Sequence, residues 1–195
     1  MITKTGRNAW IPPERLRTIL SQLNDRDLWI CTLALETGFR IDDIMTSRVQ
    51  DWGPETVALR ESKTKKLRVV GLSHAAQAAL RALIRATERD RRRDGSDWLL
   101  PGLRGRPGDS GREHRSTIWR HWRRIVRALG YPDSYTLHSL RRCYAVGVFL
   151  RHHDLNEVMH DLNHDRPSTT LLYLADALLA ASPLLGAGTG TAGAS

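Results

Sequence analysis

The stretch LNHDRPSTTLLYL, residues 162–174, places two chemically reactive side chains on either side of a helix start. His164 can move a proton or donate a hydrogen bond, and the hydroxyl of Tyr173 can act as a covalent nucleophile. Pro167 and the Ser-Thr-Thr cluster at 168–170 indicate a loop followed by the first turn of a helix. This turn separates the two side chains in sequence but can bring them together in space. The ordinary alternative for the tyrosine is a half-buried aromatic on an amphipathic helix.

A second segment, TLHSLRRCYAV (136–146), predicts a helix with Thr136 as its N-cap. His138 and Arg141 are three residues apart, so they share one face near the start of that helix. Backbone amides at a helix N-terminus bind anions, and an arginine beside them strengthens such a site. An amphipathic helix with a surface arginine would have the same pattern, so this segment alone does not decide the function.

The segment TGFRIDDI (37–44) follows a strongly apolar helix predicted over 25–37, which Gly38 should end. Arg40 therefore lies on a turn at the end of a rigid support, a suitable place for a phosphate-binding side chain. Asp43 can hold the turn, or Arg40 itself, through a charge-assisted hydrogen bond. Alone, the pair would be an ordinary surface ion pair of small energetic value.

Lysine is rare in this chain and clustered. Of the 30 basic residues 26 are arginine and four are lysine, and three of the four lysines fall in the segment ESKTKKLRVVGL (61–72). Lysine can release a proton, whereas arginine stays charged. The segment is therefore a candidate for proton transfer, with a solvated lysine-rich turn as the alternative.

In this order and spacing, the four segments resemble the catalytic domain of the tyrosine recombinases, the phage-integrase family, over roughly residues 10–180. Nine residues separate His164 from Tyr173, as between the second histidine and the nucleophile of integrase-like sequences. The family usually has glycine before that histidine, whereas this chain has Asn163, which tolerates left-handed backbone better than most residues. The resemblance implies an enzyme that cleaves and rejoins duplex DNA through a 3′-phosphotyrosyl intermediate, without a metal or other cofactor.

The resemblance also implies a role for each matching residue. Tyr173 would attack the phosphate, and His138 would take the tyrosine's proton. Arg40 and Arg141 would bind the phosphate oxygens, and His164 would donate a further hydrogen bond to them. Two fixed arginines aimed at developing phosphate charge would supply the electrostatic part of catalysis.

A lysine in the hairpin turn would protonate the departing 5′ oxygen. Lys63 occupies the matching place, at the Ser-Lys-Thr start of the turn. Lys65 and Lys66 compete for this role, and all three can contact DNA.

The segment STIWRHWRRIVRALGY (116–131) predicts an amphipathic helix with a basic face. Its tryptophans and Ile125 should pack inward while its arginines face a DNA groove or backbone. A net charge of +9 also favours a polyanionic partner. The candidate DNA-binding residues are Lys65, Lys66, Arg115, Arg120, Arg123, Arg124 and Arg127, and the residues expected on the apolar side are Trp119, Trp122 and Ile125.

The expected fold class is α+β, mainly α-helical with one small three-stranded antiparallel sheet, as in the tyrosine recombinase catalytic domain. A flexible lead over 1–10, one catalytic domain over 11–185 and a disordered tail over 186–195 make up the predicted organisation. We expect helices at 14–23, 25–37, 41–48, 74–89, 116–129, 137–150, 154–161, 167–174 and 176–185, strands at 48–52, 56–62 and 66–72, a charged run at 89–97, and a long basic loop at 101–115.

Composition argues against a membrane or secreted protein. No apolar run approaches the roughly 18 residues that cross a bilayer, and the N-terminus lacks a secretion signal, so we expect a cytoplasmic protein. Cys31 and Cys143 lie in apolar helical patterns and should be reduced core thiols. Neither has a second cysteine or histidine at zinc-ligand spacing, so no metal is expected.

Two other functions remain possible on the sequence. One is a non-catalytic DNA-binding accessory factor on an integrase scaffold, which would not need to keep His138, Arg141, His164 and Tyr173 together. The other is relaxation of DNA as in type IB topoisomerases, which use similar chemistry.

Most relatives carry a further N-terminal DNA-binding domain. The chain is therefore expected to be either a one-domain recombinase, similar to the fimbrial invertases, or a piece of a longer integrase. We expect a monomer in the free state and a homotetramer on DNA. The apolar segment 175–187 could dock on a neighbouring protomer or pack on its own core.

Overall fold

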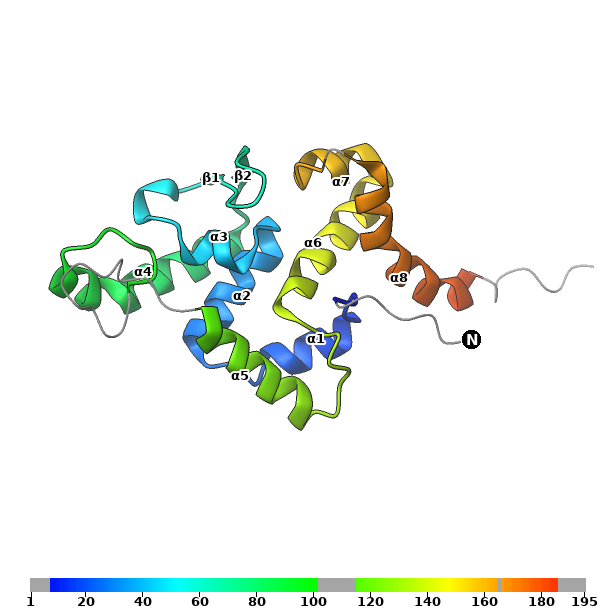
Figure 1. The fold of residues 1–195 in the computed structure, drawn as a ribbon, viewed down its shortest axis with the longest axis horizontal. Coiled ribbons are helices and arrows are strands. Elements are labelled where there is room, and N and C mark those ends of the chain that lie inside the picture. Colours follow the sequence, from blue (N-terminus) through cyan, green and yellow to red (C-terminus); the bar gives the residue numbers. More distant parts are fainter. Residues whose placement is uncertain (1–7, 102–114, 165, 186–195) are drawn as a thin grey trace, which may run out of the picture.

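The computed structural model describes residues 8–101, 115–164 and 166–185, and Figure 1 shows a mainly helical molecule with one small hairpin at the upper edge of the view. This confirms the expected mainly helical α+β fold. The predicted basic loop and C-terminal tail lie almost entirely outside the described residues. In chain order the elements are α1 (Pro13–Leu20), α2 (Asp25–Thr37), α3 (Ile41–Met45), the 3-10 helix η1 (Val49–Asp51), β1 (Thr56–Arg60), β2 (Leu67–Gly71), α4 (His74–Asp94), α5 (Arg115–Ala128), α6 (Leu137–His152), α7 (Leu155–Asp161) and α8 (Pro167–Leu185).

Helix α2 lies at the centre and packs on both α4 and α6. The side chain of Asn24 caps its start by accepting the Asp27 N–H. Gly38 ends it with φ +66°, a conformation that favours glycine, and a Cβ at this position would come within 2.4 Å of the Tyr144 ring. The predicted end of this helix is therefore correct, and the turn that carries Arg40 begins where the sequence placed it.

The sheet is a two-stranded antiparallel hairpin, so the expected third strand is wrong. Strand β1 pairs with β2 from Thr56↔Gly71 to Arg60↔Leu67. Residues 48–52 instead form η1 and two isolated bridges, one of them to Val57. The carboxylate of Asp51 accepts the Arg48 N–H at 2.7 Å, which folds this segment into a turn and prevents it from extending along β1.

Helix α4 continues beyond the predicted end, through the charged run to Asp94. Its charges pair along the helix surface, with Arg92 on Glu88 and Arg93 on Asp90 (3.3 Å). Such pairs, together with the high helix propensity of arginine, extend the helix until Gly95 ends it.

Helix α8 is one continuous element where two short helices were expected. Neither glycine nor proline occurs between Leu174 and Pro183, so nothing in that stretch stops the helix that begins at Pro167. Pro183 itself lies inside the helix, close to its C-terminal end. Figure 1 shows α8 starting beside α7 and α6 and then running away from them.

The core extends from α2 outward. Helices α2 to α5 and the inner face of β1 form its main part, and two smaller clusters join α6 to α7 and α8. In one of them, Leu174 and Ala177 of α8 pack against Val146 of α6. The first turns of α8 are therefore held by the chain's own α6.

The end of the predicted flexible lead is packed where the structure describes it. Ala9 is buried, and its N–H donates to the Ser134 carbonyl. Cys31 and Cys143 are free thiols, as expected, and burial raises the pKa of both, to about 11 for Cys143. Among the described residues, no helix has the length and hydrophobicity to span a membrane.

Candidate active site

Tyr173 lies on α8 with its hydroxyl 2.7 Å from Nε2 of His138 on α6. The His138 ring meets the tyrosine ring edge-on at 5.8 Å between centroids, and the His164 ring does so at 5.2 Å. The guanidinium of Arg142 lies 5.3 Å from the centre of the same tyrosine ring. The helix start between His164 and Tyr173 thus brings the two side chains together, as the sequence indicated.

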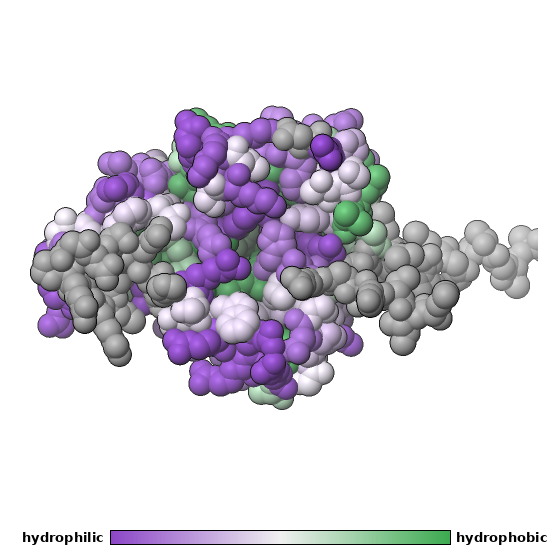
Figure 2. All heavy atoms as spheres, viewed as in Figure 1, coloured by the Kyte–Doolittle hydropathy of each residue, from purple (hydrophilic) through white to green (hydrophobic). Residues whose placement is uncertain are grey.

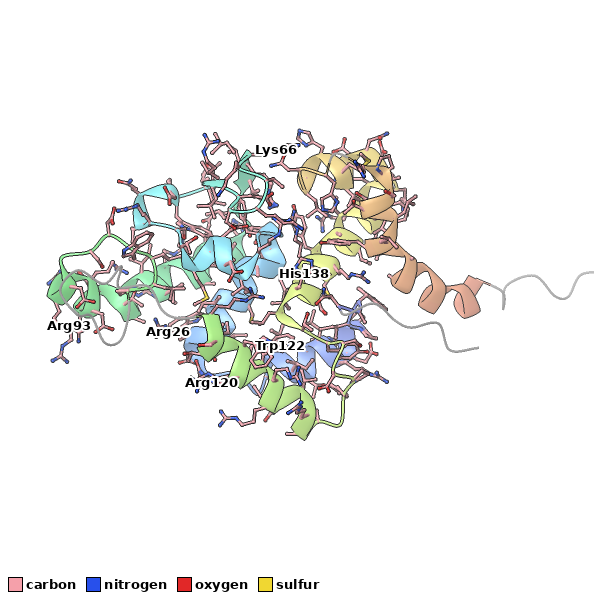
Figure 3. All side chains as sticks on the ribbon, viewed as in Figure 1. Arg26, Lys66, Arg93, Arg120, Trp122 and His138 are labelled. Atoms are coloured by element: carbon pink, nitrogen blue, oxygen red, sulfur yellow. The ribbon has the colours of Figure 1, made fainter. Side chains whose placement is uncertain are left out.

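The start of α6 fixes His138 and Arg141 near the first turn of the helix. Thr136 is the N-cap residue, as predicted, but its hydroxyl donates to Asn8 while the side chain of Ser139 accepts the Thr136 N–H. Figure 3 shows His138 in the middle of the molecule, between the hairpin and α8.

Arg141 is almost completely buried and connects three separate segments. Its Nη1 donates to the Gly38 carbonyl (2.7 Å) and to Oε1 of Glu61 (2.9 Å). Its Nη2 donates to the Leu162 carbonyl (2.7 Å). Its Nε is buried and has no hydrogen-bond partner. The side chain is therefore held on one edge and keeps an unused donor on the other.

Arg40 is the N-cap residue of α3 and approaches the same carboxylate. Its Nη1 lies 3.2 Å from Oε1 of Glu61 and 3.8 Å from Oδ2 of Asp43. The other oxygen of Asp43 accepts the Ser62 N–H at 2.9 Å. Asp43 thus contacts Arg40, one of the two partners expected of it, and also the hairpin turn, which the sequence did not predict.

Glu61 is a member of this cluster that the sequence analysis missed. Its side chain is fully buried and within 4 Å of Arg40, Arg68 and Arg141. The alternation along β1 contained the signal, since Val57 and Leu59 face inward and Glu61 continues that face. A carboxylate at an inward position of a strand needs a partner of opposite charge.

The three lysines lie in the turn that joins β1 to β2. Lys63 is exposed, and its positive charge acts on His138. Lys65 has a left-handed backbone, with φ +59°, and its N–H closes the turn on the Glu61 carbonyl. Figure 3 shows Lys66 at the outer end of the hairpin, away from His138. Of the three, Lys63 therefore has the most direct relation to the site.

Both histidines are neutral at pH 7. Burial, followed by the charges of Arg141 and Arg40, lowers the pKa of His138 to about 4. The same causes lower the pKa of His164 to about 4, against a smaller opposing effect of Glu61. A neutral imidazole can accept the phenolic proton, and the surplus of positive charge around it favours an anion.

A contact at its Nδ1 nitrogen orients the ring of His164. Its Nδ1 lies 2.9 Å from the hydroxyl of Thr170 on α8. The residue before it, Asn163, has φ +52°, the left-handed conformation that asparagine tolerates. Asparagine thus adopts here the backbone conformation that glycine would allow.

Arg40, Arg141 and His138 line one small cleft. The cleft measures about 180 Å³. A larger cavity of about 710 Å³ lies elsewhere, lined by Arg68, Tyr144 and neighbours from β2, α6 and α7. The small cleft is the one in which two arginines and a neutral histidine meet.

Helix α5 has the expected basic outer face with one correction. Trp122 is completely buried, but Trp119 is 41% exposed and stacks on Arg123 at 5.0 Å. Trp119 therefore belongs to the outer face and not to the apolar side.

Figure 3 shows Arg120 pointing away from the molecule, and Figure 2 shows a hydrophilic surface over α5. Among the candidate DNA-binding residues on and beside this helix, Arg115 pairs with Asp42, Arg123 and Arg127 pair with Asp133, and Arg120 and Arg124 are exposed.

A family model described as "Phage integrase family" matches residues 9–178, a range that contains all six candidate catalytic residues. The probable integrase/recombinase YoeC of Bacillus subtilis is 27% identical over 162 residues, covering 83% of this chain and 83% of the relative. A tyrosine recombinase of Pseudothermotoga lettingae is 26% identical, covering 83% of this chain and 54% of the relative. The tyrosine recombinase XerC of Brucella melitensis is 30% identical over 118 residues, 60% of this chain and 34% of that protein.

Solved structures share the fold. The XerA recombinase matches with a TM-score of 0.71 at 20% identity, over 93% of this chain and 66% of that one. The XerH recombinase, in a post-cleavage complex with its difH substrate, has a TM-score of 0.70 at 19% identity, over 90% of this chain and 52% of that one. A lambda integrase dimer bound to a core site has a TM-score of 0.64 at 17% identity, over 97% and 63% of the two chains.

Proposed function

The chain belongs to the phage integrase family of tyrosine recombinases, and on that basis we propose that it is a site-specific recombinase that cleaves and rejoins duplex DNA. The observation that carries the proposal is the contact between the Tyr173 hydroxyl and His138, beside two arginines that converge on one point. Nucleophile, proton acceptor and phosphate-binding groups come from three separate segments of the sequence. An accessory factor that only binds DNA would not need this arrangement.

In the first step, the Tyr173 oxygen attacks the scissile phosphorus and the P–O5′ bond breaks. A phenol loses its proton in water only at a pH of about 10, so the proton must leave as the new bond forms. Nε2 of His138 accepts it at 2.7 Å. The products are a 3′-phosphotyrosyl enzyme and a free 5′ hydroxyl, and attack by a 5′ hydroxyl from a partner strand reverses the step.

Arg40, Arg141 and His164 hold the phosphate oxygens. Arg141 is oriented by the carbonyls of Gly38 and Leu162, so its guanidinium is fixed before DNA arrives. His164 can accept the Thr170 hydroxyl at Nδ1 and then carry its proton on Nε2, as a donor to the phosphate. Fixed donors need no reorganisation as negative charge develops on the phosphate.

The bound phosphate also changes His138. The charges of Arg141 and Arg40 are part of what lowers the pKa of this histidine. A phosphate between the arginines offsets their charge, so the pKa of His138 rises when DNA binds. The histidine thereby becomes a stronger base when the substrate is in place.

Lys63 protonates the departing 5′ oxygen from the hairpin turn, and Lys65 and Lys66 contact DNA. The exposed face of α5 binds the DNA backbone or groove. Strand exchange between two duplexes requires four cleavages, so we propose four protomers in the complex with DNA, a monomer when free, and action in the cytoplasm.

The test is a DNA duplex nicked close to the cleavage point, so that the short 5′ product diffuses away and the covalent complex accumulates. The protein should form an adduct, and Tyr173→Phe should bind the same DNA without forming one. Peptide mapping of the adduct to Tyr131, Tyr135 or Tyr144 would overturn the assignment of the nucleophile. Binding by the unaltered protein with no adduct at any tyrosine would favour the non-catalytic accessory role.

A further inference from the structure

Glu61 is placed to control both the arginines and the lysine of the site. One oxygen, Oε1, accepts a hydrogen bond from Arg141 at 2.9 Å and lies 3.2 Å from Arg40. The other oxygen, Oε2, accepts the hydroxyl of Thr64 at 3.0 Å. Thr64 follows Lys63 directly in the turn. A single buried carboxylate therefore touches the two phosphate-binding side chains and the segment that carries the proton donor.

The charge of Glu61 holds groups together that would otherwise repel. Burial opposes its ionisation, but the charges of Arg141 and Arg40 outweigh burial, and the pKa of Glu61 lies below the usual value. The carboxylate is therefore ionised at neutral pH. Without it, Arg40 and Arg141 would lie close together with no negative charge between them, since the nearest oxygen of Asp43 is 3.8 Å from Arg40.

The backbone of Glu61 closes the turn as well. Its N–H donates to the Lys66 carbonyl at 2.9 Å, and its own carbonyl accepts the Lys65 N–H at 2.9 Å. The turn that carries Lys63 is thus fixed at its base by backbone bonds and at its side by the bond from Thr64 to Oε2.

We propose that Glu61 is a positioning residue of the cleavage reaction: Oε1 sets the spacing of Arg40 and Arg141, and Oε2, through Thr64, sets the turn that presents Lys63. This inference rests on the function proposed above. A purely structural Glu61, which only neutralises buried arginines, would affect folding but not the rate of cleavage in molecules that are folded and bound to DNA.

The experiment compares Glu61→Gln and Thr64→Val on two nicked substrates, one with the ordinary 5′ oxygen and one with sulfur at that position. A thiol has a pKa of about 8.5, so the sulfur leaves without a proton and no longer needs the lysine. Single-turnover adduct formation at saturating DNA measures the cleavage rate, and thermal melting and DNA binding are measured beside it. Asp94→Asn is the matched control, because Asp94 is a largely buried carboxylate that pairs with Arg93 at the far end of α4.

Thr64→Val should slow cleavage of the oxygen substrate, and sulfur should restore the rate because only the presentation of Lys63 is lost. Glu61→Gln should slow cleavage about 100-fold, the cost of a misplacement of about 1 Å, and sulfur should restore it only in part because the arginines are still displaced. Asp94→Asn should cleave both substrates like the unaltered protein.

Three results would overturn the inference. Normal cleavage by folded, DNA-bound Glu61→Gln would remove any positioning role, and full rescue of this variant by sulfur would remove the role of Oε1. If Glu61→Gln does not fold, Thr64→Val decides alone, and a normal rate on the oxygen substrate rejects the proposal. Absence of any adduct from the unaltered protein would instead reject the proposed function, and the inference with it.

Discussion

The two histidines of the site are held in their neutral form by the residues around them. The pKa of each is about 4 in the folded protein, against about 6.5 for an unperturbed imidazole. Both side chains should therefore bind protons in the unfolded chain at pH values where they remain neutral in the folded one. This difference couples the site to the stability of the whole fold.

Acidification from pH 7 to pH 5 should lower the free energy of unfolding for this reason. The unfolded chain takes up protons on His138 and His164 below a pH of about 6.5, while the folded protein does so only below a pH of about 4. Urea unfolding at several pH values measures the effect, and His138→Gln with His164→Gln should reduce the slope. A slope that the double variant leaves unchanged would mean that other groups cause it.

Arg40 and Arg141 should respond differently to replacement by lysine, although both should lose cleavage by roughly 100-fold or more. Lysine keeps the charge but lacks the planar fork of donors. Arg141 also satisfies the carbonyls of Gly38 and Leu162, so Arg141→Lys should cost roughly 1–3 kcal/mol of stability. Arg40→Lys should change the melting temperature little. Near-normal cleavage by both variants would place the site elsewhere.

At the level of helices and strands, local signals determined what could be predicted. Gly38 fixed the end of α2, and Pro167 with the Ser-Thr-Thr cluster fixed the start of α8. The predicted third strand at 48–52 was wrong because the Arg48 N–H donates to the carboxylate of Asp51 and folds this short segment into a turn. Trp119 was misplaced because helical spacing alone does not show how wide the buried face is.

The candidate site itself could be predicted from motifs, except for Glu61. Its near neighbour Lys63 stood out because lysine is rare in the chain, whereas a single glutamate does not stand out. Glu61 is important because its carboxylate lies close to Arg40 and Arg141 in space, although both arginines are far from it in sequence. Only the ion pairs that Glu61 makes with Arg40 and Arg141 in the folded chain show that relation.

Helix α5 should bind DNA through the arginines that are not paired with a carboxylate among the residues that the structure describes. Arg124→Ala should weaken binding of every DNA sequence and lower the salt dependence by about one phosphate contact. Arg127→Ala should weaken DNA binding less than Arg124→Ala, because Arg127 already pairs with Asp133 at 3.3 Å. Binding measured across a salt series decides this, with Arg93→Ala on α4 as the control. Equal salt slopes for Arg124→Ala and the control would exclude this face of α5.

For the whole molecule, the arrangement explains how a small domain can hold the tyrosine that we propose as the nucleophile. Tyr173 belongs to a cluster with Ala145, Val148, Val158 and Leu162. The next residue, Leu174, and Ala177 one turn further on pack on α6. The contact of Tyr173 with His138 is therefore made within one chain. Assembly is therefore not needed to bring the tyrosine to His138.

Truncation after Ala177 should separate packing from assembly. The contacts of Leu174 and Ala177 with Val146 remain in this variant, so the melting temperature of the free protein should change little. The full chain should sediment as a monomer alone and as four copies with two DNA duplexes. If residues 178–195 join neighbouring protomers, the truncated chain should still form the Tyr173 adduct on a single duplex but fail to assemble two duplexes. A truncated protein that is unstable as a free monomer, with no separate loss of assembly, would show that this segment serves the chain's own core.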